Sequence, residues 1–345
     1  MTTDLVVADL ERGDKTICLA VSPSLKKKGV KNRCRVFEIP SHIHYIKAPP
    51  RMQKYIDYAA SIYGIYLRYF SFEDVYVYSI DEAFLDVTGY LARYKKTPKE
   101  MAVFLMDRIT DEVGVRATAG IGTNLYLCKI ALDINAKHAP DFIGVLDEES
   151  YREKLWDHKP LSDFWRIGRG IEARLARFGI FTMRQIAHAP EDLLYKEFGI
   201  DAELLIDHAW GRESVTMRDI KAYKPKNNSI CSGQVLFKDY PFDEALVVVK
   251  EMGDDIALQL SRKKKKAAGI TLGVGMAGRS GGGGRHMSYS FPSPTQNDLA
   301  FRDIAARLFV SMVGKDEYVR RFMISLSGIV DDNDPVQLDL FQDNE

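Results

Sequence analysis

The sequence contains few cysteines, and their spacing fits neither a metal site nor a disulfide framework. Only four occur in 345 residues, far apart and without a C-x-x-C pair. A structural zinc site and a disulfide-rich secreted fold are therefore disfavoured. We expect free thiols in a reducing cytoplasm at Cys18, Cys34, Cys128 and Cys231.

Long apolar runs are also missing from the sequence. No stretch approaches the roughly 18 apolar residues that a membrane-spanning helix needs. Acidic residues close to Met1 break the basic-then-apolar order of an export signal. The sequence therefore predicts no membrane partner and a cytoplasmic location.

The chain has no excess charge of either sign, because Lys+Arg and Asp+Glu both number 48. Net charge therefore gives no argument for nucleic-acid binding, and any such argument must come from clusters of charge. Two basic clusters do occur, at residues 26–35 and 262–266.

Apolar residues are plentiful, at 46% of the chain, which excludes wholesale disorder. The length predicts two to four compact units, and no tandem repeat divides it. Residues 1–50 predict a small, partly β-structured lobe with a basic face. Further on, periodicity and capping patterns predict helices at 52–68, 98–109 and 122–137, a strand at 118–121, and an antiparallel hairpin at 75–87.

The second half of the chain has two different patterns. Residues 156–226 are broken into short helical segments by glycines, which predicts a small helical unit. Residues 228–330 have the order β-α-β-β-α-β, which predicts one four-stranded sheet with two helices. The predicted strands are 229–237, 270–276, 286–291 and 321–330, and the predicted helices are 242–262 and 296–312. The fold class is therefore α+β.

Two adjacent acids, Asp81 and Glu82, fall at the end of the predicted hairpin. Their carboxylates are the hard oxygen ligands that Mg²⁺ takes, and such ions stabilise the attacking and leaving oxygens in phosphoryl transfer. An Asp-Glu pair alone is more often an ordinary solvated turn.

The surrounding segment YSIDEAFLDVTGY resembles the S-I-D-E-x-F-x-D-x-T signature of Y-family translesion DNA polymerases, in the UmuC/ImpB/MucB/SamB-type bacterial branch. The likeness covers essentially residues 1–341. It implies a right-hand-shaped lesion-bypass polymerase that adds deoxynucleotides to a primer 3′ end, with roles in DNA repair and the SOS response to DNA damage. The implied domains are fingers 1–50 (N-terminally incomplete), palm 51–155, thumb 156–227, little finger 228–330 and clamp-binding tail 331–345.

The same resemblance implies the reacting groups. Asp81 and Glu82 would hold two Mg²⁺ ions, with Glu82 nearest the primer hydroxyl. The fingers carry S-P-S-L-K where the family has Y-x-x-R, so Lys26 would bind the triphosphate together with Lys137, while Lys129 matches a second family lysine. Lys26 could instead be a solvated surface lysine, and Lys137 could instead stabilise the dipole at the end of its own helix.

Two segments resemble DNA-binding parts of the family. FWRIGRGIEARL resembles a helix-hairpin-helix, whose turn at Gly168, Arg169 and Gly170 would contact a DNA phosphate. A helix-breaking loop is the alternative. The run Arg262, Lys263, Lys264, Lys265 and Lys266 lies in the part that resembles the little finger, where a solvated helix end is the competing interpretation.

The C-terminal segment Gln337, Leu338, Asp339, Leu340 and Phe341 resembles the bacterial sliding-clamp-binding pentapeptide. Its apolar residues have no local core, so a pocket on a partner suits them. The alternative is a tail that folds back on its own domain. The implied partners are thus primer–template DNA, dNTP and the sliding clamp, and we expect a monomer.

One family element has no match, namely a first strand of the form D-M-x-x-F-Y-A. Without it the palm sheet lacks a buried strand and the metal site lacks its third carboxylate. We therefore expect Met1 to be an internal start. One rival interpretation is a catalytically inactive DNA- and clamp-binding protein. A second is a nucleotidyl cyclase, which would need neither a thumb nor a clamp peptide.

Overall fold

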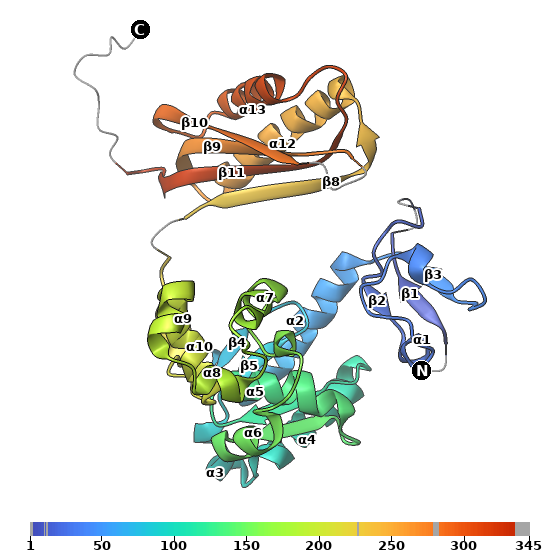
Figure 1. The fold of residues 1–345 in the computed structure, drawn as a ribbon, viewed down its shortest axis with the longest axis vertical. Coiled ribbons are helices and arrows are strands. Elements are labelled where there is room, and N and C mark those ends of the chain that lie inside the picture. The colour runs from blue at the N-terminus through green and yellow to red at the C-terminus, as the bar shows by residue number, and fades with distance from the viewer. Residues whose placement is uncertain (1–2, 10, 12, 226–227, 279–282, 335–345) are drawn as a thin grey trace. The chain divides into compact units, whose positions relative to one another are not determined.

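A computed structural model describes residues 3–9, 11, 13–225, 228–278 and 283–334 (Figure 1). Contacts divide the chain into residues 51–223, called here the central unit, and a second unit that groups residues 1–50 with 224–345. No helix in the described ranges is long and apolar enough to cross a membrane. The four cysteines are free, as expected.

The N-terminal lobe is partly β-structured, as predicted. Its three strands form a small sheet in the order β2-β1-β3, with β1 antiparallel to β2 and parallel to β3. The buried side chains include Val6, Cys18, Leu25 and Val36. The lobe consists of β1 (Leu5–Val7), β2 (Ala20–Val21), α1 (Pro23–Lys27) and β3 (Ile46–Ala48).

The segment after residue 228 forms the predicted β-α-β-β-α-β sheet, with antiparallel strands in the order β10-β9-β11-β8. Strand β9 begins at Lys265, earlier than the predicted 270, because its first residues pair with the end of β11. The elements are β8 (Ile230–Tyr240), α12 (Phe242–Arg262), β9 (Lys265–Met276), β10 (Gly284–Thr295), α13 (Asp298–Met312) and β11 (Val319–Asp331).

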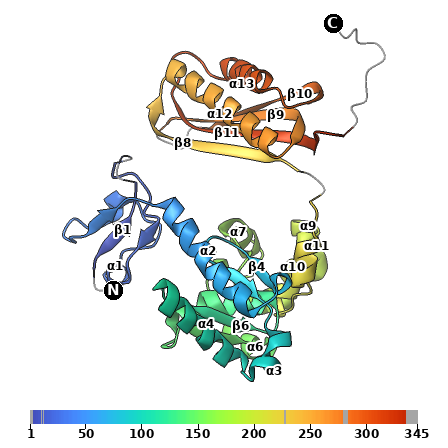
Figure 2. The same ribbon diagram turned by 180° about the vertical axis from the view of Figure 1, so that it is seen from behind.

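Helices α12 and α13 cover one face of this sheet, as Figures 1 and 2 both show. The alternation of side chains along β11 explains the arrangement. Phe322, Ile324 and Leu326 point into the helix-covered core, whereas Met323 is 54% exposed on the other face. One face of the sheet is therefore left uncovered by the helices.

The first part of the central unit contains the predicted helices and hairpin. Helix α2 lies against α4 (Figure 2), and both pack on strands. The elements are α2 (Met52–Tyr69), β4 (Val75–Val77), β5 (Ala83–Leu85), α3 (Leu91–Tyr94), α4 (Pro98–Val113), β6 (Ala119–Gly122), α5 (Leu125–Ile130), β7 (Ile143–Leu146) and α6 (Glu148–Leu155).

Helix α4 starts where the sequence predicts. The Thr97 side chain accepts from the Glu100 backbone N–H, and the Glu100 carboxylate accepts from the Thr97 N–H. This reciprocal capping, with Pro98 in the first turn, satisfies donors that a helix end otherwise leaves free. Gly114 ends the helix with φ of 73°, in the left-handed region that glycine tolerates.

The strands of the central unit form two separate pairs instead of one sheet. Strands β4 and β5 are antiparallel, whereas β6 and β7 are parallel. Within the described residues no strand joins β5 to β6. A cavity of about 180 Å³ is lined by residues of both strands, among them Ala83, Leu85 and Gly120.

Glycines allow α5 to lie directly on the β6-β7 pair. A Cβ atom on Gly120 or Gly122 would come within 2.2 Å of the Cys128 backbone, and one on Gly144 within 2.1 Å of the Ala131 carbonyl oxygen. The predicted helix over 122–137 therefore starts later, at the Asn124 cap. It then widens into a π-helical turn over Ala131–Asn135, an irregularity that often marks functional sites.

The helical segment that follows shares its core with α5 and α6. Tyr126 and Tyr151 belong to the same buried cluster as Phe164, Leu175 and Met183. The predicted small helical unit is thus part of the central unit. Its helices are α7 (Arg169–Ala176), α8 (Met183–Ala187), α9 (Glu191–Phe198), α10 (Asp201–Ala209) and α11 (Met217–Ala222).

The close approach of α5 to β6 predicts that Gly122→Ala lowers the free energy of unfolding by more than about 2 kcal/mol, because the new methyl group would clash with backbone atoms that cannot rotate away. Urea unfolding followed by circular dichroism measures this. The matched control is Gly64→Ala in α2, where a Cβ meets nothing within 4 Å. The Gly64→Ala change should raise the free energy of unfolding by about 0.5–1 kcal/mol. Equal effects at both positions would contradict the packing argument.

Candidate functional site

The two acids lie in the turn between β4 and β5, as predicted. The backbone N–H groups of Tyr78 and Ser79 both donate to the Glu82 carbonyl oxygen, at 3.0 and 3.1 Å. This closes the turn tightly and brings both carboxylates to the end of the hairpin. Asp81 and Glu82 are adjacent in sequence, but their side chains have different surroundings.

Asp81 is exposed and is oriented by its own turn. The Ser79 hydroxyl donates to Asp81 Oδ1 at 2.8 Å, and the Asp81 N–H donates to Ser79 Oγ at 3.4 Å. A serine two residues before an aspartate commonly makes such local bonds. They hold the carboxylate in place and leave it accessible to solvent.

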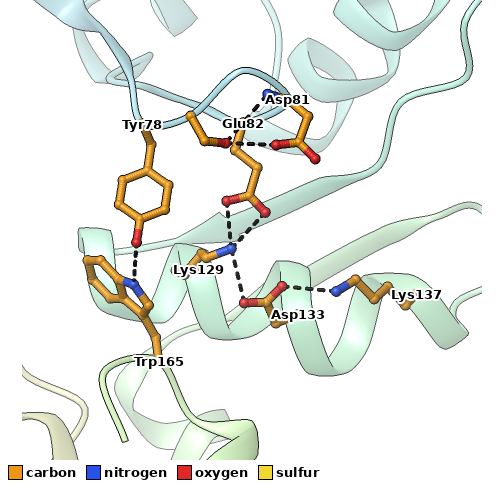
Figure 3. Close-up of polar contacts among 8 residues, drawn as sticks. Tyr78, Asp81, Glu82, Lys129, Asp133, Lys137 and Trp165 are labelled. Carbon is orange, nitrogen blue, oxygen red and sulfur yellow. Dashed lines mark hydrogen bonds and ion pairs between the residues drawn. The ribbon is translucent and has the colours of Figure 1, made fainter. Parts of the chain in front are cut away.

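Glu82 is bound to a lysine from another element (Figure 3). Both carboxylate oxygens accept from Lys129 Nζ at 2.8 Å. Lys129 also pairs with Asp133 at 3.0 Å, and Asp133 in turn pairs with Lys137 at 3.0 Å. The four side chains form a line of alternating charge from the hairpin along the helical segment.

Lys129 is unusual because it is a lysine with only 7% of its surface exposed. Burial by itself lowers the pKa of an ammonium group, but the hydrogen bonds to Glu82 and Asp133 outweigh it and raise the pKa of Lys129. The ammonium is therefore charged at neutral pH and neutralises the inner acid of the hairpin.

A cavity of about 860 Å³ lies beside the acids, within the range typical of small-molecule sites. Tyrosines of α2, among them Tyr55 and Tyr58, line one side. Asp81, Arg116 and Lys137 also line it. The cavity therefore combines stacking surfaces with groups of both charges.

The donor set suits one Mg²⁺ ion better than two. Mg²⁺ is commonly held by one or two carboxylates together with waters and substrate phosphates, and Asp81 and Glu82 offer that number. No group of three acid, histidine or cysteine side chains that could hold a metal occurs among the described residues.

The predicted phosphate-binding lysines lie in different units. Lys137 lines the cavity and pairs with Asp133, with 57% of its side chain exposed. Lys26 is exposed in α1 of the N-terminal lobe. A shared role of the two lysines stays a prediction.

The predicted DNA-contacting turn lies exposed at the start of α7. Gly168 and Gly170 have ordinary φ angles, and a Cβ on either would meet nothing within 4 Å. The fold itself therefore does not require glycine here, whereas close approach of an outside group would. The clamp-binding pentapeptide at 337–341 lies outside the described residues.

The basic run divides into two parts. Arg262, Lys263 and Lys264 are exposed at the end of α12. Lys265 and Lys266 lie in β9, where they pair with the neighbouring Asp331 and Asp332 at 2.6 and 3.1 Å. Acids thus already neutralise the charge of the last two lysines, and DNA contact by this run stays a prediction.

Sequence reasoning gave Lys129 only a secondary place and did not identify Asp133, Tyr78 or Trp165. The spacing was a usable signal, since Asp133 is four residues from both lysines and such residues share a helix face. Trp165 donates from Nε1 to the Tyr78 hydroxyl at 3.0 Å. That contact joins segments 87 residues apart and has no local signal.

Comparisons with known proteins identify the family. The model of the impB/mucB/samB family matches residues 2–133, and the model of its C-terminal domain matches residues 227–340. The chain belongs to the impB/mucB/samB family, and the sequence resemblance to this branch of the Y-family polymerases is confirmed.

Individual relatives extend over nearly the whole chain. UvrX of Bacillus subtilis (strain 168), named for UV-damage repair, is 35% identical, covering 99% of this chain and 80% of its own. DNA polymerase IV 2 of the same organism is 33% identical, covering 95% and 78%. A solved Y-family DNA polymerase chimera of Dbh and Dpo4 has a TM-score of 0.75 at 20% identity, covering 95% and 92%. The predicted α+β polymerase fold is confirmed, and the relatives' names support DNA polymerase as the enzyme class.

The buried charge line predicts that Lys129→Met lowers the free energy of unfolding by about 2 kcal/mol, because Glu82 and Asp133 lose their shared cation. Urea unfolding measures the change. The control is Lys137→Met. It removes an exposed ion pair and should change the free energy of unfolding by less than about 0.5 kcal/mol.

The pH dependence gives a second readout. Since folding raises the pKa of Lys129, its contribution is complete below the unfolded value of about 10.4 and is lost as the pH rises through the folded value. The stability of the Lys129→Met protein should therefore decline less at alkaline pH than that of the unchanged protein. An identical decline in both proteins would contradict the assignment.

Proposed function

We propose that this chain is a template-directed DNA polymerase of the lesion-bypass type, which adds deoxynucleotides to a primer 3′ end. The observation that carries the proposal is the pair Asp81 and Glu82 at a hairpin end, opening on a cavity that Lys137 also lines. Family membership and the names of the relatives supply the reaction class.

The acids have separate roles in this proposal. Asp81, exposed and oriented by Ser79, would hold Mg²⁺ against the nucleotide phosphates. Glu82 would lie nearest the primer hydroxyl and would exchange its contact with Lys129 for the metal. The bound metal would neutralise charge on the transferring phosphoryl group. The full two-ion mechanism needs a further carboxylate that the described residues do not provide.

Cationic side chains would complete the nucleotide site. Lys137 lies on the cavity wall and would release Asp133 to reach a triphosphate. Lys26 would bind the triphosphate as a point charge, without the bidentate geometry of an arginine. Both would compensate the negative charge that builds on the leaving phosphates.

The remaining segments would hold primer–template DNA and the replication machinery. We assign fingers to 1–50, palm to 51–155, thumb to 156–227, little finger to 228–330 and the clamp-binding tail to 331–345. The exposed turn at Gly168–Gly170 would take a phosphate on its backbone N–H groups. The pentapeptide 337–341 would bind the sliding clamp.

A second candidate is a DNA- and clamp-binding protein without polymerase activity. One specific observation favours it, since the described residues offer two carboxylates at the site and no third. Primer extension by the purified chain with Mg²⁺ separates the candidates. Extension supports the polymerase, whereas intact DNA binding without any product supports the inactive binder.

The proposed metal role of Asp81 predicts that Asp81→Ala reduces primer extension by orders of magnitude, because phosphoryl transfer depends on metal placement. DNA affinity should change less than about twofold, since no DNA contact is assigned to this side chain. Asp107→Ala, at an exposed position on α4, is the control and should extend primers normally. Full extension by the Asp81→Ala protein would remove the assignment.

The division of the basic run predicts different salt dependences of DNA binding. Changing Lys263 and Lys264 to Gln should reduce the slope of log affinity against log salt by about 2, because each phosphate contact contributes about 0.9. Changing Lys265 and Lys266 should alter the slope much less, since acids already pair with them. Fluorescence anisotropy over a salt series measures both slopes, and equal changes would refute the division.

A further inference from the structure

We propose that Trp165 is a positioning residue that couples the Gly168–Gly170 turn to the acidic hairpin through its hydrogen bond to Tyr78. The proposal rests on the proposed polymerase function, because it assigns DNA contact to the turn and metal binding to the hairpin. It adds a physical connection between the two that neither assignment contains.

Trp165 contacts the hairpin on both sides of the acids. Its Nε1 donates to the Tyr78 hydroxyl at 3.0 Å (Figure 3), with the rings edge to face at 5.9 Å. Its ring also lies 6.1 Å from that of Phe84, a buried residue of β5. Tyr78 precedes the acids and Phe84 follows them, so one indole ring contacts both arms of the turn.

Tyr78 connects Trp165 to Glu82 in two ways. The Tyr78 N–H donates to the Glu82 carbonyl oxygen, so a shift of Tyr78 moves the backbone of the acid itself. Lys129 Nζ, which binds the Glu82 carboxylate, lies 5.8 Å from the centre of the Tyr78 ring. Tyr78 thus touches Glu82 through the backbone and through the lysine that neutralises it.

On its other side Trp165 is anchored in the core of the central unit. It stacks on His208 at 6.1 Å and 19°, and His208 stacks on Tyr126 at 3.9 Å and 15°. His208 is 2% exposed and is bound to Glu213 at 3.0 Å. Tyr126 belongs to α5, the helix that carries Lys129. The contacts therefore close a ring from the hairpin through Trp165 and α5 back to Glu82.

Trp165 also lies next to the DNA-contacting turn along the chain. Only Arg166 and Ile167 separate it from Gly168, and Arg166 has φ of 69°, in the left-handed region. The Arg166 guanidinium lies 5.0 Å from the centre of the indole ring. A phosphate that moved this turn would therefore move the indole, and with it the hydroxyl of Tyr78.

The role is one of geometry more than of stability. The Tyr78 side chain is 40% exposed, and a solvated hydrogen bond contributes little to folding. Small displacements of catalytic groups can nevertheless reduce rates by up to about a hundredfold. Trp165→Phe and Tyr78→Phe, which each remove the hydrogen bond and keep a ring, should therefore reduce kcat for primer extension by about tenfold.

A double-mutant cycle tests the coupling. The variant with both substitutions should lose no more activity than either single variant, because all three lack the same bond. DNA affinity and urea stability should stay close to those of the unchanged protein. Tyr195→Phe, at a tyrosine of similar exposure in α9, is the control and should leave kcat unchanged. Additive losses, or losses that follow DNA affinity alone, would overturn the proposal.

A second readout separates this proposal from the proposed function. The chain has three tryptophans, so ¹⁵N labelling gives three indole N–H signals, and Trp165→Phe identifies one of them. This signal should shift when primer–template DNA binds, and Tyr78→Phe should move it in the free protein. If the chain extends no primer but shows both shifts, the proposed polymerase function is contradicted and the proposed coupling is supported. If the chain binds DNA but the Trp165 indole signal does not shift, the proposed coupling is contradicted.

Discussion

The arrangement of this site depends on one buried charge, the ammonium group of Lys129. It lies between Glu82 and Asp133, and its burial would be unfavourable without these two acids. The two acids come from the β4-β5 hairpin and from the π-helical turn that follows α5. The charge line therefore sets the position of the hairpin end relative to α5.

Close packing makes that position reproducible. The glycines of β6 and β7 let α5 and the π-helical turn lie directly against the strands, which fixes the height of Lys129 above them. Asn124 sets the first turn of the helix and thereby its rotation. A side chain at any of the three glycines would lift the helix and move the ammonium away from Glu82.

A metal ion at this site would compete with Lys129 for Glu82. Without an ion the lysine supplies a single positive charge, and with an ion the same carboxylate can bind a divalent cation while the lysine keeps Asp133. Asp81 needs no such exchange because it is exposed and its hydrogen bond is to Ser79 of the same turn. Under the proposed function the two adjacent acids would therefore meet a metal differently, Asp81 directly and Glu82 by exchange with Lys129.

Local sequence patterns predict most of the elements and the acidic pair. Helix α4 is predictable because Thr97, Pro98 and Glu100 form a local cap, and the hairpin is predictable because its strands are adjacent in sequence. The order β-α-β-β-α-β likewise follows from local periodicity. By contrast, the neutralisation of Lys265 and Lys266, the Glu82–Lys129 pair and the Trp165–Tyr78 hydrogen bond become visible only in the folded chain. These contacts join residues 47 to 87 positions apart, and no local preference encodes which distant side chain fills the space.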